Sequence, residues 1–279
     1  MRIQDAERLA QALGLESGEA RAEVQLLLSR ALGITKAHLA AHPELAAEAA
    51  AHSVYREYLQ RRLTGEPVAY ILGEREFYGL RLRVDPAVLI PRPETELLVE
   101  LALARIPTGK PCEVLDIGTG SGCVAVAVAH ARPICRVIAT DVSAAALAFA
   151  QDNAARHRTG NVEFRQGECF TPVTGERFDL ILSNPPYVAE GDPHLARGDL
   201  RFEPRQALIA GADGLSALRA IVTQARAHLR EGGWLLLEHG CDQGDPVRSS
   251  MLAHGLKEVF TERDLAQLPR VSGGRYPQA

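Results

Sequence analysis

Apolar residues recur at helical spacing from Met1 to about Leu63. The recurring positions are Leu9, Leu13, Leu26, Leu27, Leu28, Leu32 and Leu39, and the pattern is interrupted at Gly14, Gly33 and Pro43. Such spacing is typical of amphipathic helices joined by short turns. The pattern predicts a small all-α domain over residues 1–75, with one of its helices in the alanine-rich segment 46–51.

The spacing of apolar residues changes from helical to alternating directly after residue 75. Apolar and polar residues alternate through 76–84, and Gly79 interrupts the alternation near its middle. Two short strands joined by a tight turn produce this pattern. We therefore expect a linking β-hairpin within residues 76–92, leading into a second domain over 93–279.

Strand-like apolar runs alternate with helix-length segments in the rest of the chain. These runs cover 113–117, 136–140, 178–183 and 234–238. The alternation is typical of an α/β fold with a doubly wound, mostly parallel Rossmann-like sheet. Ligands of such sheets bind outside the carboxyl ends of the strands. The loops after residues 117, 140 and 183 are therefore where we look for function.

Composition and charge narrow the class of protein. The chain has 279 residues, 46% of them hydrophobic, and 31 basic against 35 acidic residues give a net charge of -4. This length suits two domains, and the balance lacks the broad positive field on which non-specific nucleic-acid binding relies. No apolar run approaches the roughly 20 residues that span a bilayer, and the first residues do not resemble a signal peptide. We expect a monomeric cytoplasmic protein without a nucleic-acid or membrane partner.

The cysteines indicate neither a metal site nor a disulfide framework. They are widely separated and include no CxxC pair: Cys112, Cys123, Cys135, Cys169 and Cys241. We expect buried free thiols and no bound metal.

A glycine-rich loop after the first strand predicts a nucleoside-binding site. It consists of Gly118, Thr119, Gly120, Ser121 and Gly122. A tight strand-to-helix turn is the alternative explanation. The spacing differs from the dinucleotide fingerprint, and Asp116 at the strand end would repel a pyrophosphate. Asp141 ends the next strand and can accept hydrogen bonds from both ribose hydroxyls, although it can also cap a helix. Together these features favour S-adenosylmethionine, a cation without phosphates.

The segment after the strand 178–183 is the most specific in the chain. It reads Asn184, Pro185, Pro186, Tyr187. Each proline favours an extended residue before it, so the Asn184 side-chain oxygen and the Pro185 carbonyl become two fixed acceptors for a planar NH2 group. Tyr187 would stack on that flat group, or pack in the core. The segment predicts methyl transfer to an amide or amine nitrogen, with a proline-stiffened turn as the alternative.

Four stretches together resemble the HemK/PrmC family of peptide chain release factor glutamine N5-methyltransferases. They are GEPVAYILG at 65–73, VLIPRPETE at 88–96, DIGTGSG at 116–122 and SNPPY at 183–187, and the similarity runs nearly end to end. The resemblance implies methylation of the glutamine in the Gly-Gly-Gln loop of release factors. It also implies that the N-terminal domain binds the factor.

Site residues follow from the same resemblance. It implies that residues 118–122, Asp141 and Asn184 bind S-adenosylmethionine and that residues 184–187 receive the glutamine. The chain departs from the family at Cys169, where an aromatic residue usually lies beside the adenine; Cys169 or Phe170 would take its place. Pro93 suits the first turn of a helix, which would bring Thr95 near the cofactor's carboxylate.

Two other functions share parts of this pattern. A nucleic-acid adenine methyltransferase would use the same acceptors on a flipped base, but it needs a basic groove. A protein-binding module could keep the fold without turnover. Residues 190–205 form either a lid over the substrate or an ordinary long loop. His38 and His42 have i, i+4 spacing without the carboxylate of a zinc motif, which favours a solvated helix face.

Overall fold

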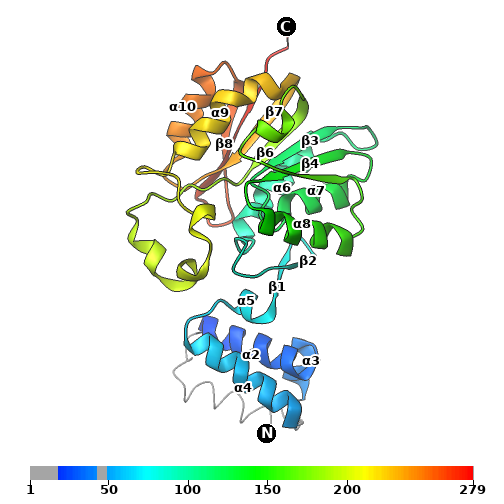
Figure 1. The fold of residues 1–279 in the computed structure, drawn as a ribbon, viewed down its shortest axis with the longest axis vertical. Helices are drawn as coiled ribbons and strands as arrows, with labels where there is room; N and C mark the ends of the chain where they lie inside the picture. The colour runs from blue at the N-terminus through cyan, green and yellow to red at the C-terminus, as the bar shows by residue number, and fades with distance from the viewer. Residues whose placement is uncertain (1–17, 43–48, 279) are drawn as a thin grey trace. The chain divides into compact units, whose positions relative to one another are not determined.

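The computed structural model describes residues 18–42 and 49–278, and the chain divides into two compact units (Figure 1). The first unit contains the chain up to Gly73 together with residues 196–202, and the second contains 74–195 and 203–279. The boundary therefore falls at Gly73, and the hairpin that we placed in a linker belongs to the second unit. Leu9, Leu13, Gly14 and Pro43 lie outside the described residues.

The first unit is helical, as the spacing predicted. Its helices are α2 (Gly18–Leu32), α3 (Lys36–Ala41), α4 (Ala49–Leu63) and α5 (Val68–Leu72). Leu27, Leu28 and Leu39 pack with Tyr55 and Leu59 in its core. Thr35 caps α3, because its side chain accepts a hydrogen bond from the His38 backbone N–H.

Residues 196–202 belong to this first unit although they follow the Asn-Pro-Pro-Tyr segment in sequence. The Arg62 guanidinium lies 3.9 Å from the Asp199 carboxylate, and an Arg201 Nη donates to the Thr64 carbonyl at 2.8 Å. The Arg201 side chain also passes so close to Gly65 that a Cβ there would lie 1.7 Å from it. Glycine at position 65 is therefore required by both this contact and its positive φ of 88°.

The second unit opens with the expected hairpin, in which β1 (Glu74–Phe77) pairs antiparallel with β2 (Leu80–Arg83). Tyr78 and Gly79 both adopt positive φ, the conformation that a two-residue hairpin turn requires. Phe77, Leu80 and Leu82 are buried in the larger core. The alternation of apolar residues thus packs one face of the hairpin onto the second unit.

A seven-stranded sheet forms the centre of this unit, and its strand order is β5-β4-β3-β6-β7-β9-β8. The strands are β3 (Glu113–Ile117), β4 (Arg136–Asp141), β5 (Val162–Gln166), β6 (Phe178–Ser183), β7 (Leu229–Glu238), β8 (Lys257–Arg263) and β9 (Pro269–Arg275). The first five are parallel, and β9 runs antiparallel to both β7 and β8. This confirms the doubly wound sheet and adds three strands, β5, β8 and β9, that the apolar runs did not indicate.

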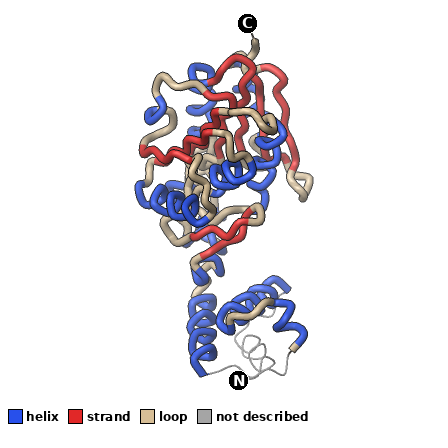
Figure 2. The backbone as a smooth tube through the Cα atoms, turned by 90° about the vertical axis from the view of Figure 1, so that its right-hand side faces the viewer, coloured by secondary structure: helices blue, strands red, loops and turns tan. Residues whose placement is uncertain are grey.

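Helices cover both faces of the sheet (Figures 1 and 2). The cluster on one face includes residues of α6 (Glu96–Arg105), α7 (Cys123–Ala131) and α8 (Ala144–Arg156). The cluster on the other includes residues of α9 (Ser216–His228) and α10 (Gly244–Ala253). Pro93 lies in the first turn of a short 3-10 helix, Pro93–Thr95, that leads into α6 as expected.

The cysteines are free thiols that differ in exposure. Cys112 and Cys135 are buried, Cys123 and Cys169 are half-buried, and Cys241 is exposed. The expectation that all five are buried is therefore wrong for Cys241, which lies in the turn before α10. Within 18–42 and 49–278, no helix has both the length and the apolar character needed to cross a membrane.

Candidate active site

The carboxyl ends of three neighbouring strands meet at one edge of the sheet. Ile117 of β3 is in register with Thr140 of β4 and with Ser183 of β6. The chain leaves β3 toward β4 and β5, then returns to place β6 on the other side of β3. Such a reversal of strand order opens a crevice for a ligand. The three loops singled out from the sequence therefore converge on one place.

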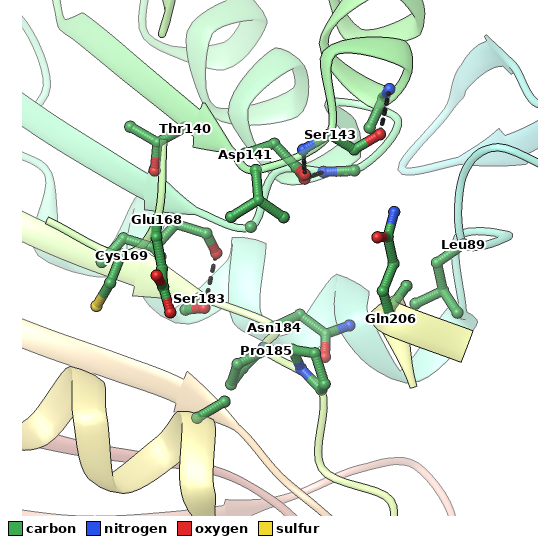
Figure 3. Close-up of a pocket in the computed structure, with 18 of the residues that line it drawn as sticks. Leu89, Thr140, Asp141, Ser143, Glu168, Cys169, Ser183, Asn184, Pro185 and Gln206 are labelled. Carbon is green, nitrogen blue, oxygen red and sulfur yellow. Dashed lines mark hydrogen bonds between the residues drawn. The ribbon is translucent and has the colours of Figure 1, made fainter. Parts of the chain in front are cut away.

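A cavity of about 270 Å³ lies at this edge (Figure 3). Its walls come from the three loops, from the loop after β5, from the segments 87–89 and 204–207, and from α8 and α9. Among the residues that line it are Leu89, Gly118, Gly120, Asp141, Ser143, Glu168, Cys169, Asn184, Pro185, Pro186, Pro204 and Gln206.

Two of the five residues in the glycine-rich loop line this cavity. Gly118 and Gly120 have positive φ values of 70° and 56°, and neither would bring a Cβ within 4 Å of another residue. Their backbone is therefore open to a ligand. Thr119 and Ser121 are buried and do not line the cavity, and a Cβ on Gly122 would lie 3.0 Å from that of Ala150. Gly122 thus serves close packing between α7 and α8.

Asp116 lies beneath the loop and does not line the cavity. It is buried, and Thr119 Oγ1 donates to its Oδ2 at 2.7 Å. Burial raises the pKa of Asp116 to about 6, although the hydrogen bond from Thr119 opposes this shift. The carboxyl group therefore supports the loop from below.

The stability of the Asp116→Asn variant, compared with that of the wild type, should increase as the pH rises. A carboxyl group whose pKa is raised by folding contributes stability below its unfolded pKa, and this contribution is lost as the pH rises through about 6. Asparagine does not titrate. The difference in unfolding free energy between variant and wild type should therefore grow by about 2 kcal/mol from pH 4.5 to pH 7.5.

Urea unfolding at both pH values measures this difference. The exposed Asp242 provides a matched control, because a carboxylate in water carries no burial cost. A difference for Asp116→Asn that stays flat across the pH range would contradict the effect of burial.

Asp141 lies across the cavity from Asn184 (Figure 3). Its Oδ2 accepts from the Gly120 backbone N–H and its Oδ1 from that of Ser143, both at 2.9 Å. Ser143 is the N-cap of α8, and its side chain accepts from the Ala146 N–H. Asp141 is therefore not the cap, and its carboxylate joins the first two loops at the cavity wall.

Cys169 rather than Phe170 lines the cavity. Phe170 is buried and stacks on the His228 ring at 4.5 Å. Cys169 has a positive φ of 50°, and its partial burial raises the pKa of its thiol. A protonated thiol presents a small, polarisable surface to a ligand. Cys169 thus occupies the place where the family resemblance leads one to expect an aromatic ring.

The Asn-Pro-Pro-Tyr segment follows β6 without forming a helix or strand. Ser183 Oγ donates to the Ile117 carbonyl at 2.7 Å and so ties the ends of β6 and β3 together. Asn184, Pro185 and Pro186 line the cavity, and Asn184 Nδ2 donates to Thr95 Oγ1 at 3.1 Å. With Nδ2 engaged, the side-chain oxygen of Asn184 remains as an acceptor.

Tyr187 is placed differently from its neighbours. It does not line the cavity, and its ring packs against the core beneath the sheet edge. Its hydroxyl donates to Glu238 Oε1 at 3.3 Å, and its backbone carbonyl accepts from Gln243 Nε2 at 3.0 Å. This placement favours the packing role over stacking on a substrate.

Thr95 also differs from expectation. Its side chain is buried, does not line the cavity and accepts from Asn184. This arrangement does not support the predicted contact between Thr95 and the cofactor's carboxylate.

An ion pair with one fully buried partner joins two walls of the cavity, and sequence reasoning missed it. Arg92, in the IPRPETE stretch, pairs with Glu203, whose side chain is fully buried. The Ile90 backbone N–H donates to Glu203 Oε2 at 3.3 Å. The turn at 87–89 and the segment beginning at Pro204 both line the cavity, so Glu203 holds them in place. The segment expected as a lid or loop thus has its middle in the first unit and its end at this cavity.

Comparison with known proteins identifies the family. Residues 3–73 match the PrmC N-terminal domain, and residues 93–199 match the methyltransferase small domain. A release factor glutamine methyltransferase from Xylella fastidiosa is 50% identical over 257 residues, which are 92% of this chain and 94% of that protein. The chain belongs to the release factor glutamine methyltransferase family. A Coxiella burnetii relative of the same name is 44% identical over 96% of both chains.

Solved structures of methyltransferases share the fold of this chain. A methyltransferase from Pyrococcus furiosus superposes with a TM-score of 0.55 at 20% identity, covering 79% of this chain and 98% of that one. The class I methyltransferase fold is thus confirmed, and S-adenosylmethionine is the cofactor of this family member.

The charges of the residues that line the cavity suit S-adenosylmethionine, which carries a positive charge and no phosphate. Asp141 and Glu168 place two carboxylates on the wall, and no Lys, Arg or His is among the described residues that line it. A phosphate-bearing cofactor would need cations or free backbone N–H groups there. A sulfonium cation on a nucleoside is suited to the carboxylates and to the largely apolar remainder of the wall.

Proposed function

We propose that this chain transfers a methyl group from S-adenosylmethionine to the side-chain amide nitrogen of the glutamine in the Gly-Gly-Gln motif of peptide chain release factors. The observation that carries this proposal is the Asn184 and Pro185 pair, which lines the cavity at the carboxyl end of β6. The names of the relatives in Xylella and Coxiella support the choice of substrate.

The geometry suits an amide nitrogen. The lone pair of such a nitrogen is delocalised into its carbonyl, so attack on a methyl group requires partial pyramidalisation. Asn184 Oδ1 and the Pro185 carbonyl would hold the two N–H bonds and leave the lone pair free. Acceptors that fit the pyramidal nitrogen better than the planar one stabilise the transition state selectively.

The cofactor supplies an electrophilic methyl group on a sulfonium. Asp141 and Gly120 would hold its ribose side, and Glu168 and Cys169 would border the base. The protein's contribution to the rate is then chiefly positioning, since no strong base is needed before the methyl group moves. As the lone pair of the nitrogen forms the new N–C bond, the S–C bond would break and its electron pair would stay on the sulfur as a neutral thioether. The nitrogen would then lose its proton, which solvent can accept.

The N-terminal helical domain is proposed as the part that binds the release factor. Its match to the PrmC N-terminal domain and its nearly balanced charges support a protein partner. Binding energy from contacts remote from the glutamine would help to place the amide at the reacting position. We further propose that the enzyme works as a monomer in the cytoplasm, without binding nucleic acid or membrane.

Adenine methylation in nucleic acid is the alternative that uses the same acceptors. It is not favoured, because the relatives are named for release factor glutamine. A module without turnover is not favoured either, since Asp141, Asn184 and Pro185 stand together at the cavity.

Labelled S-adenosylmethionine tests the substrate directly. The full chain should label intact release factor, and replacing the Gly-Gly-Gln glutamine with Ala should abolish labelling. A short Gly-Gly-Gln peptide should be labelled with much lower kcat/KM, because it lacks the remote contacts. Labelling of DNA or RNA but not of release factor would overturn the proposal. Equal kcat/KM for peptide and intact factor would overturn the role of the N-terminal domain.

A further inference from the structure

The peptide group between Tyr187 and Val188 is held at both ends, directly after the two prolines of the Asn-Pro-Pro-Tyr segment. Gln243 Nε2 donates to the Tyr187 carbonyl at 3.0 Å. The Val188 N–H donates to the Leu208 carbonyl at 2.8 Å, and the Val188 carbonyl accepts from the Ala210 N–H at 3.0 Å. Two separate parts of the second unit therefore fix the carboxyl end of the segment.

The side-chain amide of Gln243 is buried and has one possible orientation. Its Oε1 accepts from the Gly240 backbone N–H at 2.9 Å, and its Nε2 donates to the carbonyls of Tyr187 and, at 3.3 Å, Gly214. A backbone N–H only donates and a backbone carbonyl only accepts, so exchanging the amide oxygen and nitrogen would break all three hydrogen bonds. Gln243 thus joins the loops after β6 and β7 to the loop before α9.

Gly214 leaves the space that this contact needs. A Cβ at position 214 would lie 2.3 Å from the Tyr187 carbonyl oxygen and 2.9 Å from Gln243 Nε2. Both distances are well inside van der Waals contact. Because Gly214 also has a positive φ of 72°, glycine is required here by the backbone conformation and by the space that the Tyr187 carbonyl occupies.

The Pro185 carbonyl, one of the two proposed acceptors, lies two residues before this contact. The ring of Pro186 fixes its φ at about -65°, so few torsions separate the Pro185 carbonyl from that of Tyr187. Neither proline has an N–H with which to hold the segment itself. The Ser183 hydrogen bond fixes the end of β6 before the segment. Fixing the Tyr187 carbonyl after it therefore restrains the rotation that aims the Pro185 carbonyl.

We propose that Gln243 and Gly214 are positioning residues that clamp the Tyr187 carbonyl and thereby aim the Pro185 carbonyl at the substrate NH2 group. Gln243 supplies the hydrogen bond, and Gly214 leaves room for it. Neither residue lines the cavity, so their effect reaches the reaction through the backbone of the segment. The clamp rests on the proposed function for the role of the Pro185 carbonyl as an acceptor of the substrate N–H.

Gln243→Met keeps the length of the side chain and removes its donor. The single-turnover rate at saturating S-adenosylmethionine and release factor should fall about tenfold, the value of one hydrogen bond. Affinity for both ligands should be unchanged. Asn161→Leu is the matched control, because Asn161 Nδ2 also donates to backbone carbonyls, those of Ala129, Arg132 and Cys135, and does not line the cavity. The control should lower stability and keep the rate.

Gly214→Ala tests the same carbonyl from the other side. The new Cβ must displace the Tyr187 carbonyl, so the rate should fall at least as far as in Gln243→Met. Gly211→Ala is the control, because Gly211 has the same φ of 72° and a Cβ there would come no closer than 3.4 Å to the Ser216 side chain. It carries the same backbone strain and should keep the rate. Gly214→Ala and Gln243→Met together should lose less than the product of their separate effects, because both act on one carbonyl.

The peptide bond between Tyr187 and Val188 gives a readout that needs no substrate. Tyr-Val occurs once in the sequence, so ¹³C in the tyrosine carbonyl and ¹⁵N in valine yield a single cross-peak. The shift of the carbonyl carbon reports its hydrogen bond. The cross-peak should move in Gln243→Met and in Gly214→Ala, and it should stay in place in both control variants.

Three results would each overturn the clamp: a wild-type rate in either folded variant, Gln243→Met or Gly214→Ala, an unmoved cross-peak in these variants, or an equal loss of rate in the controls. If the wild-type enzyme transfers no methyl group to release factor, the proposed function fails. The cross-peak alone then decides whether Gln243 and Gly214 fix the Tyr187 carbonyl.

Discussion

Replacing Asn184 with Ala should lower the rate of methyl transfer by about a hundred- to a thousandfold, the loss expected for one preorganised transition-state acceptor. The side-chain oxygen is one of the two acceptors proposed to hold the substrate NH2 group. Pro185 and Pro186 keep the backbone in place, and the ends of β3 and β6 remain joined by the Ser183 hydrogen bond. Folding and most of the cofactor affinity should therefore survive.

Single-turnover transfer to release factor, measured beside cofactor affinity and thermal unfolding, checks this result. Asn184→Asp is the sharper variant, since it keeps the shape and an acceptor but adds a negative charge. That charge stabilises the bound sulfonium more than a transition state in which the positive charge is dispersing. Turnover should fall while cofactor binding is retained. A rate near that of wild type in folded, saturated Asn184→Ala would reduce the segment to a structural turn.

Replacing Asp141 with Ala should weaken S-adenosylmethionine binding by about 1.5–3 kcal/mol, the loss expected for hydrogen bonds to a charged group. The carboxylate already accepts from the backbone of Gly120 and Ser143, and Asp141 itself lines the cavity. Calorimetry measures the affinity. Asp152→Ala is a matched control, because Asp152 lies on α8 but does not line the cavity.

A second ligand separates contact with the ribose from support of the loop. S-adenosylhomocysteine and its 2′-deoxy analogue should differ in affinity for the wild type and differ much less for Asp141→Ala. If both proteins discriminate equally between the two ligands, Asp141 supports the loop and does not bind the ribose hydroxyl.

Much of the architecture was predictable from the sequence because local patterns carry it. The apolar run 113–117 coincides with β3, and the run 178–183 coincides with β6. Both strands are largely buried on two faces, so each sequence is mostly apolar and does not alternate strictly. The strand β5 was missed because its sequence, VEFRQ, lies at the sheet edge and is only partly buried. The antiparallel pair β8 and β9 was missed because polar and glycine residues interrupt its apolar pattern.

Some of the residues that line the cavity were also visible in the sequence. Asp141 ends a predicted parallel strand and Asn184 follows another, and the carboxyl ends of such strands meet at one edge. Cys169 follows β5, which the apolar runs did not indicate, and was expected only from the family resemblance. Gly118 and Gly120 line the cavity as well, whereas Thr119, Ser121 and Gly122 turn into the fold. Residue type alone does not tell which side of a tight loop faces the ligand.

Only the tertiary structure decided which polar residues support the site from behind. Thr95 and Asn184 are far apart in sequence, and they meet because the start of α6 packs against the end of β6. Arg92 and Glu203 likewise pair across the chain to hold two cavity walls. The motif itself determines which side chain can accept a hydrogen bond from the substrate. The orientation of that side chain depends on neighbours that long-range packing brings to it. No local pattern in the sequence indicates which residues these neighbours are.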